Sequence, residues 1–164
     1  MLDFSNSKIL IVGDVMLDKY YFGKVDRISP EAPVPIVNIQ KEESRLGGAS
    51  NVANNIVSLG GHSLLCGVIG HDLFGKEIER ISRHKNIDTF LLKTSSPTIT
   101  KARIIGGKQQ IVRVDYEDKS ELNADNKKLF RDTISRILPE YDILVISDYG
   151  KGLISEDLCR YPIT

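Results

Sequence analysis

The chain has 164 residues, of which 41% are hydrophobic, and this length and composition suit one domain with a buried core and exclude an intrinsically disordered protein. Lys plus Arg and Asp plus Glu both number 22, so no net field attracts nucleic acid or an anionic membrane surface. No apolar run approaches the roughly 20 residues of a membrane span, and MLDFSNSK lacks the regions of a secretion signal. We therefore expect a cytoplasmic protein without nucleic-acid or membrane partners.

The first expected element is a strand at residues 8–14, KILIVGD, because a short apolar run suits a parallel strand covered on both faces. Its carboxyl end is where α/β folds bind ligands. The next segment contains Pro30, Pro33 and Pro35, which exclude a helix and predict an edge ribbon or extended lid over about 20–40. We expect this ribbon to lie off the main sheet.

Helices and strands are then expected to alternate, as helix 47–60, strand 64–69, helix 72–84, strand 88–92, helix 126–138 and strand 143–148. The first of these helices places Val52, Ile56 and Leu59 on its apolar face, and Asp72 is expected to cap the second. Before the third helix, two β-rich runs around Gly-Gly-Lys predict a hairpin over about 98–117. This order predicts an α/β fold with a mostly parallel sheet, flanking helices and a small β lid.

A glycine pair opens the helix expected at 47–60, in the run GGASNVANNIVSLG. Gly47 and Gly48 allow a ligand to approach the backbone, and the unpaired N–H groups of a helix start favour hydroxyls, carboxylates or phosphates. Asn51 has an amide that both donates and accepts, so it could hold vicinal hydroxyls, although it could equally cap the helix. The run predicts a small-molecule site.

Two carboxylates, Asp14 and Asp18, follow the first strand in the run GDVMLD. They could accept hydrogen bonds from sugar hydroxyls, or Asp14 could cap a turn while Asp18 is a solvated loop charge. We favour the sugar-binding interpretation because the glycine and asparagine element follows. A dinucleotide site fits less well, since no G-x-G-x-x-G follows this strand.

Lys101, Arg103 and Arg113 are cations on the expected hairpin. They are either its solvated face or a clamp for a sugar phosphate, which arginine can bind in a bidentate manner. Asp148 and Lys151 follow the last expected strand, where they either bind a ligand or form a glycine-rich turn. Cysteine and histidine are too scattered for metal-ligand spacing, so we expect reduced thiols and no metal site.

Taken together, these motifs resemble the ribokinase-like (PfkB) carbohydrate kinases, whose N-terminal signature the glycine pair, Asn51, Gly60 and Gly70 fit. The runs GDVMLDKYYFG, RISPEAPVPIV, TITKAR and SDYGKG, with Gln109, Gln110, Arg113 and Asp115, are similar to one branch of that family, the bacterial D-glycero-β-D-manno-heptose 7-phosphate kinases. This similarity covers essentially the whole chain.

The resemblance implies a kinase that uses Mg-ATP to phosphorylate the anomeric hydroxyl of heptose 7-phosphate, on the way to ADP-heptose for the lipopolysaccharide core. It implies that the sugar is held by Asp14, Asp18, Gly47, Gly48 and Asn51, and that Lys101 and Arg103 lie near the phosphate. The proline-rich ribbon resembles a lid that closes the site and often pairs with a second subunit, so a homodimer is expected.

The chain departs from the family pattern because the N-x-x-E element and the Gly-Ala-Gly-Asp turn, which carries the general base, occur nowhere in it. We therefore expect residues 1–164 to be the N-terminal portion of a single kinase domain, with no catalytic residue. Such a chain should not bind Mg-ATP alone and should be inactive without a C-terminal half. The alternatives are a non-catalytic module for sugar-phosphate binding or dimerisation, and a ribokinase-like kinase of another sugar.

Overall fold

The chain builds two four-stranded sheets in a computed structural model that describes residues 4–118 and 122–160. Strand β1 (Lys8–Gly13) belongs to the main sheet, and strand β2 (Val15–Ile28) belongs to an accessory sheet. Asp14 alone separates these two strands, so the chain passes from one sheet to the other at that residue.

The main sheet has the order β5-β4-β1-β8 and is parallel throughout. Its other members are β4 (His62–Gly70), β5 (Asp88–Thr94) and β8 (Ile143–Ser147). Strand β1 has a neighbour on each side, and Leu10 and Ile11 point to opposite faces with no exposed surface. The expected parallel strand covered on both faces is confirmed.

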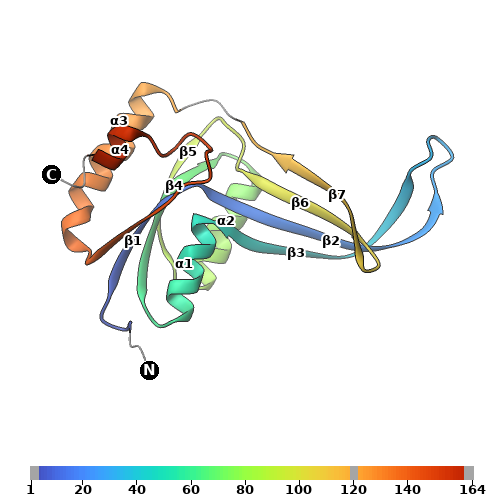
Figure 1. The fold of residues 1–164 in the computed structure, drawn as a ribbon, viewed down its shortest axis with the longest axis horizontal. Helices are drawn as coiled ribbons and strands as arrows, with labels where there is room; N and C mark the ends of the chain where they lie inside the picture. The colour runs from blue at the N-terminus through green and yellow to red at the C-terminus, as the bar shows by residue number, and fades with distance from the viewer. Residues whose placement is uncertain (1–3, 119–121, 161–164) are drawn as a thin grey trace.

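Helices cover both faces of the main sheet (Figure 1). On one face, α1 (Ala49–Ser58) and α2 (Leu73–His84) pack with Ile11 and Leu65 in one apolar cluster. On the opposite face lie α3 (Ala124–Ile137), the short helix η1 (Leu138–Glu140) and α4 (Glu156–Arg160), where Phe130 packs with Leu10 in a second cluster. None of the described helices combines the length and apolar character that a membrane crossing requires.

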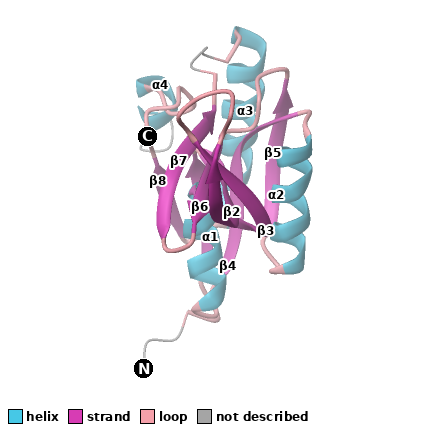
Figure 2. Ribbon diagram, turned by 90° about the vertical axis from the view of Figure 1, so that its right-hand side faces the viewer, coloured by secondary structure: helices cyan, strands magenta, loops and turns pink. Residues whose placement is uncertain are grey.

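The accessory sheet has the order β3-β2-β6-β7, with β3 (Pro35–Gly48), β6 (Thr100–Gly106) and β7 (Gln109–Tyr116). Strands β2 and β3 form the expected proline-rich ribbon, and β6 and β7 form the expected hairpin. Parallel pairing of β2 with β6 joins the ribbon and the hairpin into one sheet. This sheet projects away from the helices, to the right in Figure 1 and toward the viewer in Figure 2.

Some local expectations need correction. The ribbon is longer than expected, because β3 continues through the glycine pair and α1 begins only at Ala49. Leu59 is 65% exposed beyond the end of α1, whereas Val52 and Ile56 pack against the core as expected, beside the fully buried Ala49 and Ala53. Asp72 caps α2 as expected, since its carboxylate accepts a hydrogen bond from Gly75 N at 2.8 Å.

Candidate functional site

Asp14 lies where the two sheets meet, and its hydrogen bonds connect three segments of the chain. It is only 2% exposed, and its Oδ2 accepts hydrogen bonds from the backbone N–H groups of Tyr149 (2.8 Å) and Lys151 (3.2 Å). Its own N–H donates to Ser147 O at 3.1 Å, and its carbonyl accepts from Ala49 N at 2.9 Å. One residue therefore connects the end of β1, the start of α1 and the loop after β8.

The electrostatics of Asp14 follow from this position. Burial is the largest influence and raises the pKa of its carboxyl above the usual value, although each of the two backbone hydrogen bonds lowers it. The Oδ1 atom accepts no hydrogen bond from the described part of the chain. A buried carboxylate with one occupied and one available oxygen is suited to accept a hydrogen bond from a ligand hydroxyl.

The glycine pair is required by close packing against both aspartates. Gly48 has a φ of 54°, and a Cβ at this position would lie 2.3 Å from the carbonyl oxygen of Asp14. A Cβ on Gly47 would lie 2.6 Å from Oδ2 of Asp18. The backbone of the pair, at the end of β3, therefore lies directly against Asp14 and Asp18.

Asn51 does not cap helix α1, which was one of the two roles considered for it. The residue before the helix is Gly48, and no side chain caps the helix. Asn51 lies exposed in the first turn, so its amide is available to a ligand. Ser50, which the sequence patterns did not single out, donates from its buried hydroxyl to Gly47 O at 2.6 Å and Met16 O at 3.0 Å, and thereby fixes the glycine turn.

A second group of predicted residues meets on the accessory sheet. Arg103 on β6 donates from Nη1 to Oδ1 of Asp18 on β2 at 2.6 Å. Asp18 is therefore a strand residue in an ion pair and not a solvated loop charge. Lys101 lies directly opposite Asp18 in the register, so its side chain points from the same face of the sheet.

Arg113 and Asp115 lie on β7, the next strand of this sheet. Arg113 is the register partner of Arg103 and donates to both carboxylate oxygens of Asp115 at 2.8 and 2.9 Å. Its charge is therefore matched within its own strand. Arg113 adds to the polar face, but it is less available to an anion than Lys101, for which the described residues supply no ion-pair partner.

The loop after β8 separates the last two predicted residues. Asp148 is exposed and accepts from Gly150 N at 2.8 Å, so it forms the glycine-rich turn. Lys151 donates its backbone N–H to Asp14, while its Nζ pairs with Glu117 at 2.6 Å, with side-chain exposures of 17% and 19%. The Lys151 to Glu117 pair, which sequence reasoning missed, links this loop to the end of the hairpin.

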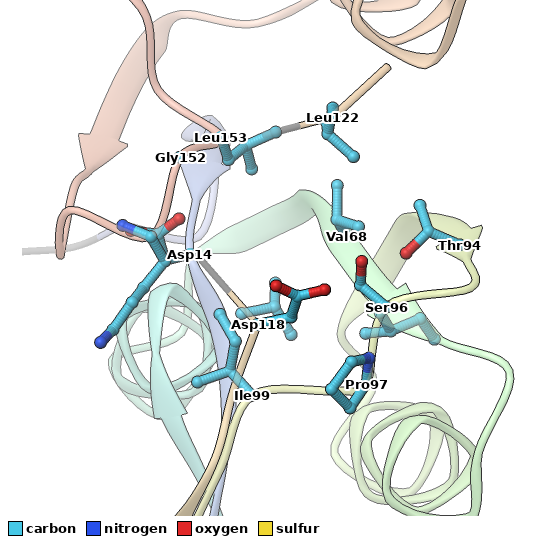
Figure 3. A pocket seen from close by; sticks show the side chains of 13 residues that line it. Asp14, Val68, Thr94, Ser96, Pro97, Ile99, Asp118, Leu122, Gly152 and Leu153 are labelled. Carbon is cyan, nitrogen blue, oxygen red and sulfur yellow. The ribbon is translucent and has the colours of Figure 1, made fainter. Parts of the chain in front are cut away.

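A small cavity lies at the carboxyl ends of β1, β4 and β5 (Figure 3). Its walls are mostly apolar, and the carboxylate of Asp118 and the hydroxyl of Ser96 are among the polar groups that line it. The volume is about 50 Å³, and one water requires at least about 10–15 Å³ of such space. The cavity has room for a few waters but not for a sugar phosphate, so the polar face that carries Asp18, Lys101 and Arg103 is the better candidate site.

The described residues offer no cluster of side chains for a divalent metal ion. Across residues 4–118 and 122–160, no group of three or more His, Cys, Asp or Glu side chains is placed to hold a metal ion. Lys101 and Arg103 lie on the accessory sheet beside Asp18.

Comparison with known proteins identifies the class to which this arrangement belongs. Residues 6–160 match the family model described as pfkB family carbohydrate kinase, so the chain belongs to the PfkB family of carbohydrate kinases. It is 46% identical over 153 residues to the bifunctional protein HldE of Nitratiruptor sp. and 46% identical over 151 residues to D-beta-D-heptose 7-phosphate kinase of Bordetella bronchiseptica. The predicted resemblance is confirmed.

These matches cover most of this chain and only part of each relative. The chain is covered to 93% and 92%, whereas the two relatives are covered to 33% and 48%. The structure of phosphofructokinase-2 from Escherichia coli in complex with fructose-6-phosphate superposes with a TM-score of 0.67 at 18% identity, over 96% of this chain and 50% of that one. The expected ribokinase-like α/β fold is confirmed.

Proposed function

We propose that this chain is the acceptor-binding portion of a single ribokinase-like domain that phosphorylates D-glycero-β-D-manno-heptose 7-phosphate at its anomeric hydroxyl. The observation that carries the proposal is the junction of the two sheets. There, the glycine pair packs against the backbone of Asp14 and against the Asp18 carboxylate, which is paired with Arg103. The names of the similar HldE and heptose 7-phosphate kinase proteins support this choice of sugar.

In this proposal the two groups of residues have different tasks. Oδ1 of Asp14, the backbone of the glycine pair, Asp18 and the amide of Asn51 hold the sugar hydroxyls. The phosphate is bound by the cations of the accessory sheet, which are Lys101, Arg103 and Arg113. Of the two residues after β8, Lys151 positions Asp14 through its backbone N–H, and Asp148 shapes the turn. The chain thereby orients the hydroxyl that receives the phosphoryl group.

Mg-ATP is the proposed phosphoryl donor of the complete enzyme, and when bound it supplies the transferred group. Because the sequence lacks the N-x-x-E element and the Gly-Ala-Gly-Asp turn, and the described residues offer no metal-ligand cluster, we propose that Mg-ATP and the general base belong to a C-terminal half that completes the domain. Edge strand β8 is a suitable contact for that half, since Ile143 and Ile146 expose 48% and 41% of their surface there. The cytoplasm is the proposed compartment.

Calorimetric titration of the chain with heptose 7-phosphate and with unphosphorylated heptose tests the proposal. We expect the phosphorylated sugar to bind more tightly, and Arg103→Gln to lose that preference by about 10-fold or more, because a hydrogen bond to a charged group contributes about 1.5–3 kcal/mol. Arg83→Gln, an exposed arginine on α2, is the control and should change nothing. Absence of sugar-phosphate binding would refute the proposal.

A parallel assay of ADP release with Mg-ATP and heptose 7-phosphate tests the assignment of the catalytic groups. We expect no turnover above background from the chain alone. Turnover would mean that a base and a nucleotide site exist among these residues. Equal binding of other sugar phosphates would favour a kinase of another sugar, and binding without any activity after completion of the domain would favour a non-catalytic module.

We also propose that two copies of the chain pair through the arm formed by β2 and β3. Apolar side chains that are unusual for a solvated ribbon support this, since Ile28 is 60% exposed and Val34 is 51% exposed near its tip. Analytical ultracentrifugation should detect a dimer that Ile28→Lys weakens, while Leu73→Lys, at a 78% exposed position on α2, leaves it intact. A monomeric wild-type chain would contradict the pairing.

A further inference from the structure

The ring of Tyr20 lies between two guanidinium groups on the polar face of the accessory sheet. The Cζ atoms of Arg45 and Arg103 lie 4.9 and 5.2 Å from the centre of the ring. Both distances are within the range of a cation–π interaction. The sequence analysis assigned no role to Tyr20 or Arg45, and only the pairing of three strands brings these residues together.

Strand register explains the arrangement. Tyr20 is on β2, the strand between β3 and β6, and its register partner on β6 is Arg103. On β3, Arg45 is the partner of Asp18 and is therefore diagonal to Tyr20 on the same face. Phe22, two residues along β2, lies parallel to Tyr20, with ring centres 6.1 Å apart and an interplanar angle of 11°. The Tyr20 ring is therefore supported by the Phe22 ring of the same strand, and it can in turn orient the guanidinium groups of Arg45 and Arg103.

Each arginine keeps donors available for an anion. Arg103 uses only Nη1, which donates to Asp18 at 2.6 Å and to Lys101 O at 3.4 Å, and Arg45 uses only Nη2, which donates to Glu43 at 2.7 Å. Within the described residues, the remaining N–H groups of both guanidiniums have no acceptor. A guanidinium whose plane is fixed by an aromatic ring and one carboxylate is prepared to bind phosphate oxygens.

The charge balance around Tyr20 favours an anion as well. Arg45, Arg103 and Lys101 supply three positive charges on this face, against the two carboxylates of Asp18 and Glu43. Glu43 is shared further with Lys41, whose Nζ lies 2.6 Å from its Oε1. The face around Tyr20 therefore keeps net positive charge that the neighbouring carboxylates do not neutralise.

We infer that Tyr20 is a positioning residue that orients Arg45 and Arg103 toward the phosphate of the bound sugar phosphate, and that Arg45 is a phosphate-binding residue. The inference rests on the proposed function for the identity of the sugar. It extends the phosphate site to a residue of β3, the outer strand of the ribbon. Arg103 is held by Asp18 and Tyr20 together, so the sugar-binding and phosphate-binding groups share one rigid face.

The test compares Tyr20→Phe, which keeps the aromatic ring, with Tyr20→Leu, which removes it. We expect Tyr20→Phe to bind heptose 7-phosphate within about twofold of the wild-type chain and Tyr20→Leu to bind about 10-fold more weakly, the loss expected when oriented charged donors are released. Binding of unphosphorylated heptose should be the same in both variants. Arg45→Gln should weaken phosphate binding similarly, and Arg80→Gln, which removes an exposed ion pair on α2, should not.

Nuclear magnetic resonance of the arginine Nε–H groups separates this inference from the choice of sugar. In the ligand-free chain, Tyr20→Leu should shift the Arg45 and Arg103 resonances because the ring current is lost, while Tyr20→Phe retains their positions. Titration with inorganic phosphate should move the same two resonances. If phosphate moves them and heptose 7-phosphate does not bind, the anion site stands and the proposed sugar fails. If phosphate moves neither, or Tyr20→Leu binds like wild type, the inference is overturned.

Discussion

Replacement of Asp14 gives a direct measure of what holds the junction between the two sheets. Asp14→Ala removes the acceptor of two backbone N–H groups, at 2.8 and 3.2 Å, whereas Asp14→Asn keeps a carbonyl oxygen in the same place. A partly buried donor that loses its acceptor costs about 1–3 kcal/mol, so the alanine variant should lose about 3 kcal/mol and the asparagine variant less than about 1 kcal/mol.

Urea unfolding followed by circular dichroism measures the difference. A chain of this size has an m-value of about 2 kcal/mol per M, so the midpoint should fall by about 1.5 M in Asp14→Ala and by less than about 0.5 M in Asp14→Asn. Equal midpoints for the two variants would refute the reasoning, because they would mean that the loop after β8 does not depend on the acceptor at residue 14.

A comparison of the wild-type chain with Asp14→Asn tests the pKa of Asp14. Burial raises this pKa above its ordinary value of 3.8, so between 3.8 and the raised value the folded chain binds more protons than the unfolded chain. Ionisation of Asp14 therefore lowers the free energy of unfolding as the pH rises through that window. Asp14→Asn lacks this effect, so its stability relative to wild type should increase with pH there. A difference that is constant with pH would contradict the burial argument.

Three further substitutions or labels test other parts of the fold. Gly48→Ala should cost about 3 kcal/mol or more by urea unfolding, because positive φ and a clash with backbone add, whereas Gly60→Ala should cost only about 1 kcal/mol, since a Cβ there meets nothing within 4 Å. Burial raises the pKa of Asp72, but the hydrogen bonds that its carboxylate accepts lower the pKa further, so that the net shift is downward. The stability of the wild-type chain should therefore fall as the pH drops below about 4. Thermal unfolding of Asp72→Asn should not show this dependence on pH. Burial raises the pKa of Cys66 to about 12, so a thiol reagent at neutral pH should label Cys159 and spare Cys66 in the folded chain, and mass spectrometry showing the reverse would contradict the packing.

The sequence predicts the individual elements well because each has a local cause. The apolar run of β1, the capping carboxylate of Asp72 and the glycine turn of the β6 to β7 hairpin can all be recognised within a few residues. The joining of the ribbon and the hairpin cannot be recognised in this way. It depends on pairing Asp18 with Lys101 and Tyr20 with Arg103 across parallel strands, and no local pattern specifies the register between segments so far apart.

In the candidate site, too, the individual residues can be predicted from local sequence, but the contacts between them cannot. Asp14, Asp18 and the glycine pair could be proposed from one stretch of sequence, and Arg103 from another, but their contact depends on the sheet. Tyr20 has a signal that could have been used, since it alternates with Asp18. That signal is readable only if β2 is known to begin at Val15, directly after the first strand, where the sequence suggested a loop.

The pairing of β1 with β8 also determines when the main sheet can form during protein synthesis. Ile9 pairs with Ile143, and the backbone N–H of Lys8 bonds to Asp142, a residue 134 positions later. On the ribosome, β1 therefore acquires its second neighbour only after nearly the whole described chain has emerged. Folds with contacts of such long sequence separation form slowly, because loop closure precedes any gain from packing. Until β8 arrives, one edge of the most buried strand stays open to other nascent chains.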